Sequence, residues 1–268
     1  MAENPRTQKT LRPLSVGNIV SSGVQLYRSN LRTYLSLAFV SYLWIFVPVY
    51  GWAKYSMISG LISRLAFQEL IHQPETVAQA RGKVKPRLWS FLSAGIQVVL
   101  RMVVIYLIGA ILVAITIAVL TAIVPLLGAI AAVPLVIGFL VVLIRFFSRW
   151  FVVEVPLAVE PNLNGSQSID RSWNLTKQSV GRVQVVAVVG FLVTFPLLML
   201  TGYIPSFLVL ALPEDSGLIA IANLASFALS LIGGVLVMPF WQAIKAVTYY
   251  DLRSRQEGLD LELRGRRA

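Results

Sequence analysis

Cysteine is absent from this chain, and histidine occurs only once, as His72. Without cysteine the protein can form no disulfide bond and no catalytic thiolate. Zinc and related metal sites usually draw on cysteine and on more than one histidine, so the pattern favours a surface loop residue over a metal ligand or a catalytic base. We therefore expect neither a metal nor another cofactor.

Charged residues are also scarce. They make up 13% of the sequence, whereas soluble domains usually contain roughly 25%. Hydrophobic residues make up 57%, and several apolar runs reach the approximately 18 to 20 residues needed to cross the hydrocarbon core of a bilayer. The composition predicts an all-α, polytopic membrane helix bundle that forms a single integral membrane domain over residues 1–268.

The apolar runs predict about six transmembrane helices arranged as three hairpins. In chain order they are Leu31–Val47, Trp52–Leu70, Met102–Ile123, Ile130–Ile144, Val183–Leu210 and Leu218–Trp241. The second run is the weakest, because it carries Lys54 and Arg64 near its ends. The alternative is a single crossing by the first two runs, which would leave the loop from Arg81 to Arg87 outside the cell.

Positive charge is distributed unevenly between the connections. The chain has 23 Lys and Arg against 12 Asp and Glu, and six crossings would leave only Lys54 on the far side of the membrane. The outer connections, Pro48–Gly51, Val124–Gly128 and Pro213–Gly217, contain no Lys or Arg. By the positive-inside rule, both termini are predicted to be cytoplasmic. The basic residues flank apolar spans, so they do not indicate nucleic-acid binding.

Amphipathic segments precede each predicted hairpin, at Leu14–Asn30, Glu75–Ser90 and Ser166–Gly181. The first has apolar residues at helical spacing, which is typical of a helix lying on the membrane surface. We therefore divide the chain into a cytoplasmic N-terminal segment with a surface helix (1–30), a membrane bundle (31–243) and a basic cytoplasmic tail (244–268). Three units of surface helix plus hairpin suggest an internal repeat.

Four arginines are candidate contacts for lipid headgroups. Arg101 and Arg145 flank the central hairpin, and Arg149 and Arg171 follow on the same predicted side. Arginines at such positions can bind lipid phosphates, although long side chains at span ends also extend routinely into the headgroup layer without a specific ligand. Both interpretations remain open from sequence.

Several acidic residues are candidates for structural ion pairs. We expect Glu154, Glu160 and Asp170 to pair with Arg149 or Arg171, with a cation or proton site as the alternative. The segment from Tyr249 to Arg255 should continue the last helix into the cytoplasm until Gly258 ends it. There, Asp251 should pair with Arg255 or with an arginine of the Arg171 region. Such a pair is expected to be exposed and to contribute little stability.

Three segments carry a resemblance to a known family. They are LSVGNIVSSGVQLYRSNLRTYLSLA from Leu14, VPLAVEPNLNGSQSIDRSWNLTKQSVGRV from Val155, and YYDLRSRQEGLDLEL from Tyr249. They resemble bacterial integral membrane proteins related to the glycerophosphoryl diester phosphodiesterase membrane domain. The resemblance implies a six-helix architecture in a bacterial inner membrane. It does not carry over the hydrolase activity, which belongs to a separate soluble barrel in the members that named the family.

No nucleophile paired with a base, no metal-ligand set and no phosphate-binding glycine loop can be assembled from the sequence. We therefore expect a non-catalytic multi-pass protein that organises lipids or other membrane proteins. Its expected partners are membrane lipids, mainly anionic ones, and another integral membrane protein. The alternative is a transporter or channel for a neutral or lipid-like substrate, because prolines within the spans could break helices around a central site.

Overall fold

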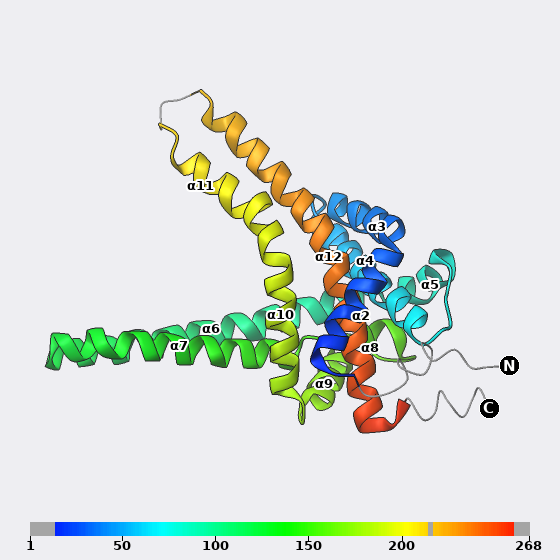
Figure 1. Cartoon of the computed structure of the whole chain (residues 1–268), viewed down its shortest axis with the longest axis horizontal. Helices are drawn as coiled ribbons and strands as arrows, with labels where there is room; N and C mark the ends of the chain where they lie inside the picture. Colours follow the sequence, from blue (N-terminus) through cyan, green and yellow to red (C-terminus); the bar gives the residue numbers. More distant parts are fainter. Residues whose placement is uncertain (1–13, 214–216, 260–268) are drawn as a thin grey trace.

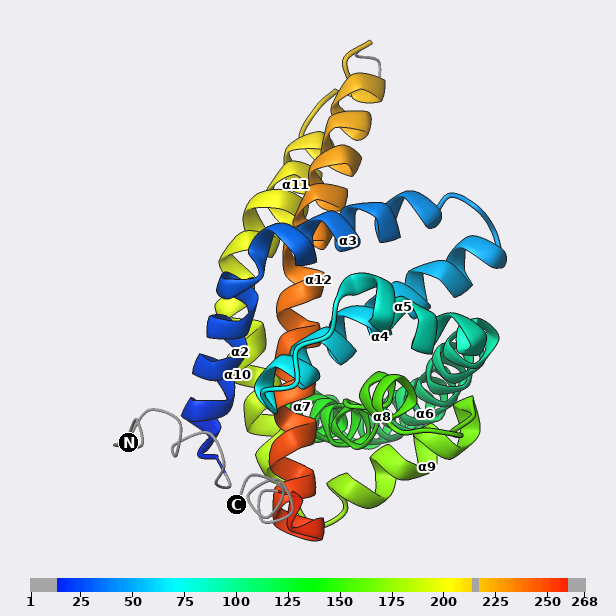
Figure 2. The same cartoon turned by 90° about the vertical axis from the view of Figure 1, so that its right-hand side faces the viewer.

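The computed structural model describes residues 14–213 and 217–259, which are helical throughout apart from short connections and contain no strand. Figures 1 and 2 show two helical hairpins that project from a body of shorter helices. The α-helices are α2 (Val16–Ser29), α3 (Leu31–Trp44), α4 (Tyr50–Leu70), α5 (Val77–Val84), α6 (Leu88–Ile123), α7 (Pro125–Arg149), α8 (Glu154–Val159), α9 (Gly165–Thr176), α10 (Val180–Leu198), α11 (Ile204–Leu210) and α12 (Ile219–Glu257). A 3-10 turn at Lys85–Arg87 precedes α6, and a π-helical turn at Met199–Tyr203 joins α10 to α11.

Four helical segments of the described chain are long and apolar enough to cross a membrane. They are Val77–Ile123, Pro125–Val159, Val180–Leu210 and Ile219–Glu257. The prediction of an all-α membrane protein is confirmed, but the predicted number of spans is not matched. The difference lies in the first predicted hairpin.

The first two apolar runs do form a helical hairpin, α3 and α4. However, α3 has 14 residues, which at about 1.5 Å per residue is too short for a hydrocarbon core about 30 Å thick. Most of α4 is buried inside the protein, including Leu61 and Ile62 at 0% exposure. The apolar residues of α4 therefore face other helices, and a hydropathy pattern does not distinguish that environment from lipid.

The hairpin of α6 and α7 projects from the body (Figure 1), and most of its residues between Arg101 and Arg145 are exposed. The two helices run side by side, and Gly109 allows this close approach, because a Cβ there would lie 2.2 Å from the ring of Phe139. Large apolar residues on both helices are exposed, among them Leu112 and Ile137. Such a surface is favourable only in lipid or against another apolar surface.

The second hairpin consists of α10, the π-helical turn, α11 and the N-terminal half of α12. It leaves the body in a different direction from α6 and α7 (Figure 1), so in one bilayer at least one hairpin must lie tilted. Pro196 precedes the π-helical turn by three residues, and the missing N–H of proline weakens the regular helical ladder there. The turn lies where the hairpin changes direction.

The body surrounds the C-terminal half of α12, with α2, α4, α8, α9 and the first half of α10 packed around it (Figure 2). Ala243, Val247, Tyr249 and Tyr250 are all 0% exposed. Residues 244–257, assigned from sequence to a basic tail, are therefore the last turns of α12, and most of those up to Ser254 are buried. The helix ends at Gly258, which has the left-handed φ of 66° that glycine adopts without strain.

The amphipathic helix α2 packs its apolar face on protein. Ile19, Val20 and Leu26 are buried, and Gly23 lies so close to α12 that a Cβ would stand 2.7 Å from Ile244 Cγ1. Helix α9 likewise buries Ile169 and other residues of one face. The prediction that these apolar faces lie on the membrane surface is wrong, because in both helices the apolar residues are buried against the body.

Asp251 accepts hydrogen bonds from three parts of the body. The sequence predicted an exposed position, but Asp251 is buried, with 1% exposure. Its carboxylate accepts hydrogen bonds from the backbone N–H of Leu14 at 2.6 Å, from Arg182 Nε at 2.8 Å and from Arg255 Nε at 3.0 Å. The pairing with Arg255 follows the helical spacing, whereas Arg182 comes from α10. Because Asp251 is buried, removing its carboxylate should destabilise the protein far more than removing one partner of a surface ion pair.

Candidate functional site

A cluster of cationic and aromatic side chains lies where the α6–α7 hairpin joins the body. Arg101 comes from α6, Arg149 from the last turn of α7, Trp150 follows directly, and Trp173 comes from α9. Arg145 precedes Arg149 by four residues, so both lie on the same face of α7. We call Arg101, Arg145, Arg149, Trp150 and Trp173 the hairpin-base cluster.

Two of these arginines stack on tryptophans. The guanidinium carbon of Arg149 lies 4.0 Å from the ring centroid of Trp173, and that of Arg101 lies 6.0 Å from the ring of Trp150. The two tryptophan rings are 5.8 Å apart, and Phe146 packs within 6.2 Å of both. Stacking on an aromatic face holds a guanidinium in place while leaving its edge N–H groups free to donate to a ligand.

Hydrogen bonds from α9 position Trp173 beneath Arg149. Ser172 Oγ and Thr176 Oγ1 both donate to the backbone carbonyl of Arg149, at 2.9 and 3.3 Å. Ser172 and Thr176 are fully buried, so these bonds form away from water. They join the end of α7 to α9 and hold the tryptophan ring against the guanidinium.

The arginines of the hairpin-base cluster lack acidic partners. Within residues 14–213 and 217–259, no ion pair involves Arg101, Arg145 or Arg149. Moreover, Arg149 Nη1 is buried and has no hydrogen-bond partner among the described residues. A buried charged donor without an acceptor is costly, and an anion at this position would remove that cost.

Arg171 differs from the other three predicted lipid contacts because it is paired with acidic residues. Its Nε donates to Glu160 at 2.9 Å and its Nη1 pairs with Glu257 at 2.5 Å. Two carboxylates therefore already neutralise its charge. The structure thus brings Arg101, Arg145 and Arg149 to the same base of the hairpin and places Arg171 in an ion-pair network of the body.

The predicted acidic residues lie in different environments. Glu160 pairs with Arg171, but Glu154 pairs with Lys245 Nζ at 2.9 Å instead of with Arg149 or Arg171. Asp170 is exposed and has no ion pair within the described part of the chain. His72 is an exposed residue in the turn after α4, and the described residues hold no group of three or more side chains suited to a metal ion.

Trp150 lines two hollows beside the hairpin-base cluster. One is an open apolar groove of about 350 Å³ lined by Leu100, Arg101, Val104, Ile105 and Trp150. The other is a cavity of about 210 Å³ whose lining includes Trp150 and the ion pair of Glu154 and Lys245. The groove joins apolar side chains to a guanidinium, an arrangement that suits a lipid chain attached to an anionic headgroup.

Sequence reasoning identified the arginines of this cluster but missed what organises them. The sequence did not indicate that Trp150, Trp173 and Lys245 contribute to this region. Trp173 lies 24 residues after Arg149, so no local spacing connects the two. Ser172 and Thr176 lie four residues apart and therefore on one face of α9. This spacing was the signal of a buried polar contact that the sequence offered.

Comparisons with protein-family models, with curated proteins and with solved structures found no match to this chain. The four apolar helices make it a membrane-embedded helical protein.

Proposed function

We propose that this chain is a non-catalytic, multi-pass membrane protein that binds anionic lipid headgroups at the hairpin-base cluster and organises lipids or other membrane proteins around its apolar hairpins. The observation that carries the proposal is the buried, unpartnered Nη1 of Arg149 beside two further arginines without acidic partners. A lipid phosphate would accept from these donors, and its acyl chains would follow the exposed apolar surface of α6.

Topology agrees with this assignment. Four crossings would keep both termini on one side, and the connections at 124 and 211–218 contain no Lys or Arg. Lys54 would then join the other basic residues, so the positive-inside rule favours a cytoplasmic body and cytoplasmic termini. The resemblance of three segments to bacterial proteins related to the glycerophosphoryl diester phosphodiesterase membrane domain supports a bacterial inner membrane as the location.

Native mass spectrometry of the purified protein would test the proposal. Replacing Arg149 with Gln removes a charge-assisted hydrogen bond of about 1.5–3 kcal/mol, which corresponds to a roughly tenfold or larger loss of affinity for phosphatidylglycerol. Arg101→Gln with Arg145→Gln should add to that loss. Arg81→Gln is the matched control, because it removes the same charge from an exposed site on α5. Equal lipid retention by the control and by Arg149→Gln would contradict the proposal.

A transporter for a neutral or lipid-like substrate is the alternative. It is favoured by the π-helical turn at Met199–Tyr203 and by Pro134 and Pro239 inside α7 and α12, since interrupted helices often line transport sites. Among the described residues of the hairpins, no charged side chain is buried away from the body, which argues against an ionic substrate. Flux of a lipid-like solute across liposomes that contain the protein would establish transport, and its absence would leave the lipid organiser.

A further inference from the structure

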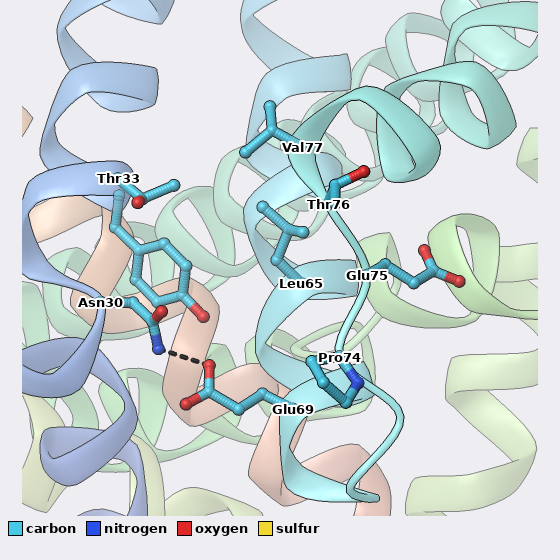
Figure 3. Close-up of a pocket in the computed structure, with 9 residues that line it drawn as sticks. Asn30, Thr33, Leu65, Glu69, Pro74, Glu75, Thr76 and Val77 are labelled. Carbon is cyan, nitrogen blue, oxygen red and sulfur yellow. Dashed lines mark hydrogen bonds between the residues drawn. The ribbon is translucent and has the colours of Figure 1, made fainter.

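A third hollow lies in the body, between α3, α4 and the segment that leads into α5. Figure 3 shows its lining residues. Its volume is about 210 Å³, and its polar lining comes from Asn30, Thr33, Tyr34, Glu69, Glu75 and Thr76. No arginine or lysine lines it. It shares no lining residue with the hairpin-base cluster, so it is a separate candidate site.

The two carboxylates of this hollow differ in how they are neutralised. Glu75 accepts from Arg64 Nε and Nη2, both at 2.8 Å, and from Lys83 Nζ at 2.5 Å. Glu69 accepts only from neutral groups, the Ser29 hydroxyl at 3.4 Å and the side-chain amide of Asn30. Within the described ranges no lysine or arginine pairs with Glu69, so its negative charge is uncompensated.

Neutral hydrogen bonds fix the direction of the Glu69 carboxylate. Figure 3 shows Glu69 and Asn30 pointing toward each other, while the carboxylate of Glu75 points away from Glu69. Asn30 is the residue between α2 and α3, so the bond ties that junction to the end of α4. The carboxylate is therefore held in place before any ligand arrives, which lowers the entropic cost of binding.

Tyr34 supplies a second, independent indication of a ligand. Its side chain is 1% exposed and lines the hollow, yet within the part of the chain that the structure describes its hydroxyl has no hydrogen-bond partner. Burial, together with the nearby Glu69 carboxylate, raises the pKa of the Tyr34 phenol, so the group stays protonated. A buried hydroxyl without a partner is unfavourable, and a donor placed in the hollow would satisfy its lone pairs.

We propose that this hollow binds a primary ammonium group, with the charge neutralised by Glu69 and one N–H donated to Tyr34 Oη. A primary ammonium carries three donors and no acceptor, which matches a free carboxylate and a free hydroxyl. Such a group occurs both in the ethanolamine headgroup of a lipid and in soluble alkylamines.

Other ligand classes fit the lining less well. An anion would face the uncompensated charge of Glu69. A quaternary ammonium has no N–H to donate and usually needs a cage of several aromatic rings, whereas Tyr34 is the one aromatic residue in the lining. Ca²⁺ prefers six to eight oxygen ligands. Of the two carboxylates in this lining, Glu75 is already paired with Arg64 and Lys83, so only Glu69 is available to a cation.

Calorimetry of the full chain in detergent micelles, with ethylammonium and putrescine as probes and tetramethylammonium as the comparison, would test this proposal. Both primary amines should bind, and tetramethylammonium should bind at least tenfold more weakly. Glu69→Gln should weaken ethylammonium at least tenfold, whereas Asp170→Asn, which removes an exposed carboxylate elsewhere, should leave the affinity unchanged. Equal binding by Glu69→Gln, equal binding of tetramethylammonium, or no heat with any amine would overturn the proposal, the last indicating a hollow filled by water.

Tyr34→Phe provides a second variant that keeps the packing of the ring. Without ligand, its melting temperature should equal or exceed that of the wild type, because the unpartnered hydroxyl is gone, while ethylammonium binding should weaken about threefold to tenfold. Unchanged affinity would overturn the role of Oη. Nanodiscs with phosphatidylethanolamine or phosphatidylcholine distinguish the sources: a stabilisation specific to ethanolamine lipid identifies a headgroup site, and binding of soluble amines alone identifies a solute site.

Discussion

Leu61 on α4 and Leu112 on α6 are both leucines, and the sequence predicts that both helices cross the membrane. Leu61 is 0% exposed within the protein, whereas Leu112 is 60% exposed. The body buries its apolar residues against one another, and the α6–α7 hairpin turns them outward. Apolar sequence therefore serves two purposes in this chain: it builds a protein core in the first region and a lipid-facing surface in the second.

Polar residues follow the same division. The body holds buried contacts such as Ser63 Oγ donating to Gln242 Oε1 at 2.6 Å and the three bonds to Asp251. Arg64 is 6% exposed, and its Nη1 donates to the carbonyl of Ala158 at 2.6 Å. Along the hairpin the hydroxyls of Thr116 and Thr121 instead return to carbonyls of their own helix. The body thus gains specificity from polar contacts between helices, whereas the described residues of α6 and α7 make no such side-chain contact with each other.

The largest expected effect is that of Asp251→Ala. The substitution leaves Arg182 without its carboxylate partner and frees the Leu14 N–H at a buried site, so we expect a loss of about 3–5 kcal/mol in stability. Thermal unfolding in detergent measures it. Asp170→Ala, at an exposed position without an ion pair among the described residues, should change stability by less than about 0.5 kcal/mol. Similar melting of the two variants would contradict the buried network.

Truncating the two leucines tests the comparison directly. Leu61→Ala should destabilise the protein by about 2–5 kcal/mol, because it removes buried contacts and leaves a cavity. Leu112→Ala should have a much smaller effect, since its side chain contacts lipid or detergent both before and after unfolding of the body. Melting curves of the two variants in the same detergent provide the measurement. Comparable losses would mean that the hairpin is packed against protein in the membrane.

The smallest expected effect concerns pH. Hydrogen bonds from Arg64 lower the pKa of Glu75 below its ordinary value of 4.5, and Lys83 acts in the same direction. The unfolded chain therefore binds the proton more readily, so the stability due to Glu75 is present above about pH 4.5 and is lost as the pH falls through the folded pKa. Melting temperatures between pH 6 and pH 3 should fall less steeply for Glu75→Gln than for the wild type. Parallel curves would exclude this contribution.

Several elements were predictable because their signals are local. The turn between α6 and α7, the end of α12 at Gly258 and the i, i+4 pairing of Asp251 with Arg255 all depend on residues close in sequence. The partners Arg182 of Asp251 and Lys245 of Glu154 were not predicted, because they lie 69 and 91 residues away. The three clustered arginines were identified, but the tryptophan platform beneath them depends on the docking of α9 on α7.

The sequence by itself determined that this is a helical membrane protein, because long apolar runs and few charges are stable only in a bilayer or a large core. It also determined that the basic residues flank the long apolar runs after residue 100 and do not lie within them. Only the tertiary structure decided which apolar helices meet lipid and which meet protein, as α4 and α6 illustrate. Hydropathy measures the transfer of a side chain out of water, and that free energy is favourable whether the residue enters a bilayer or the interior of a protein.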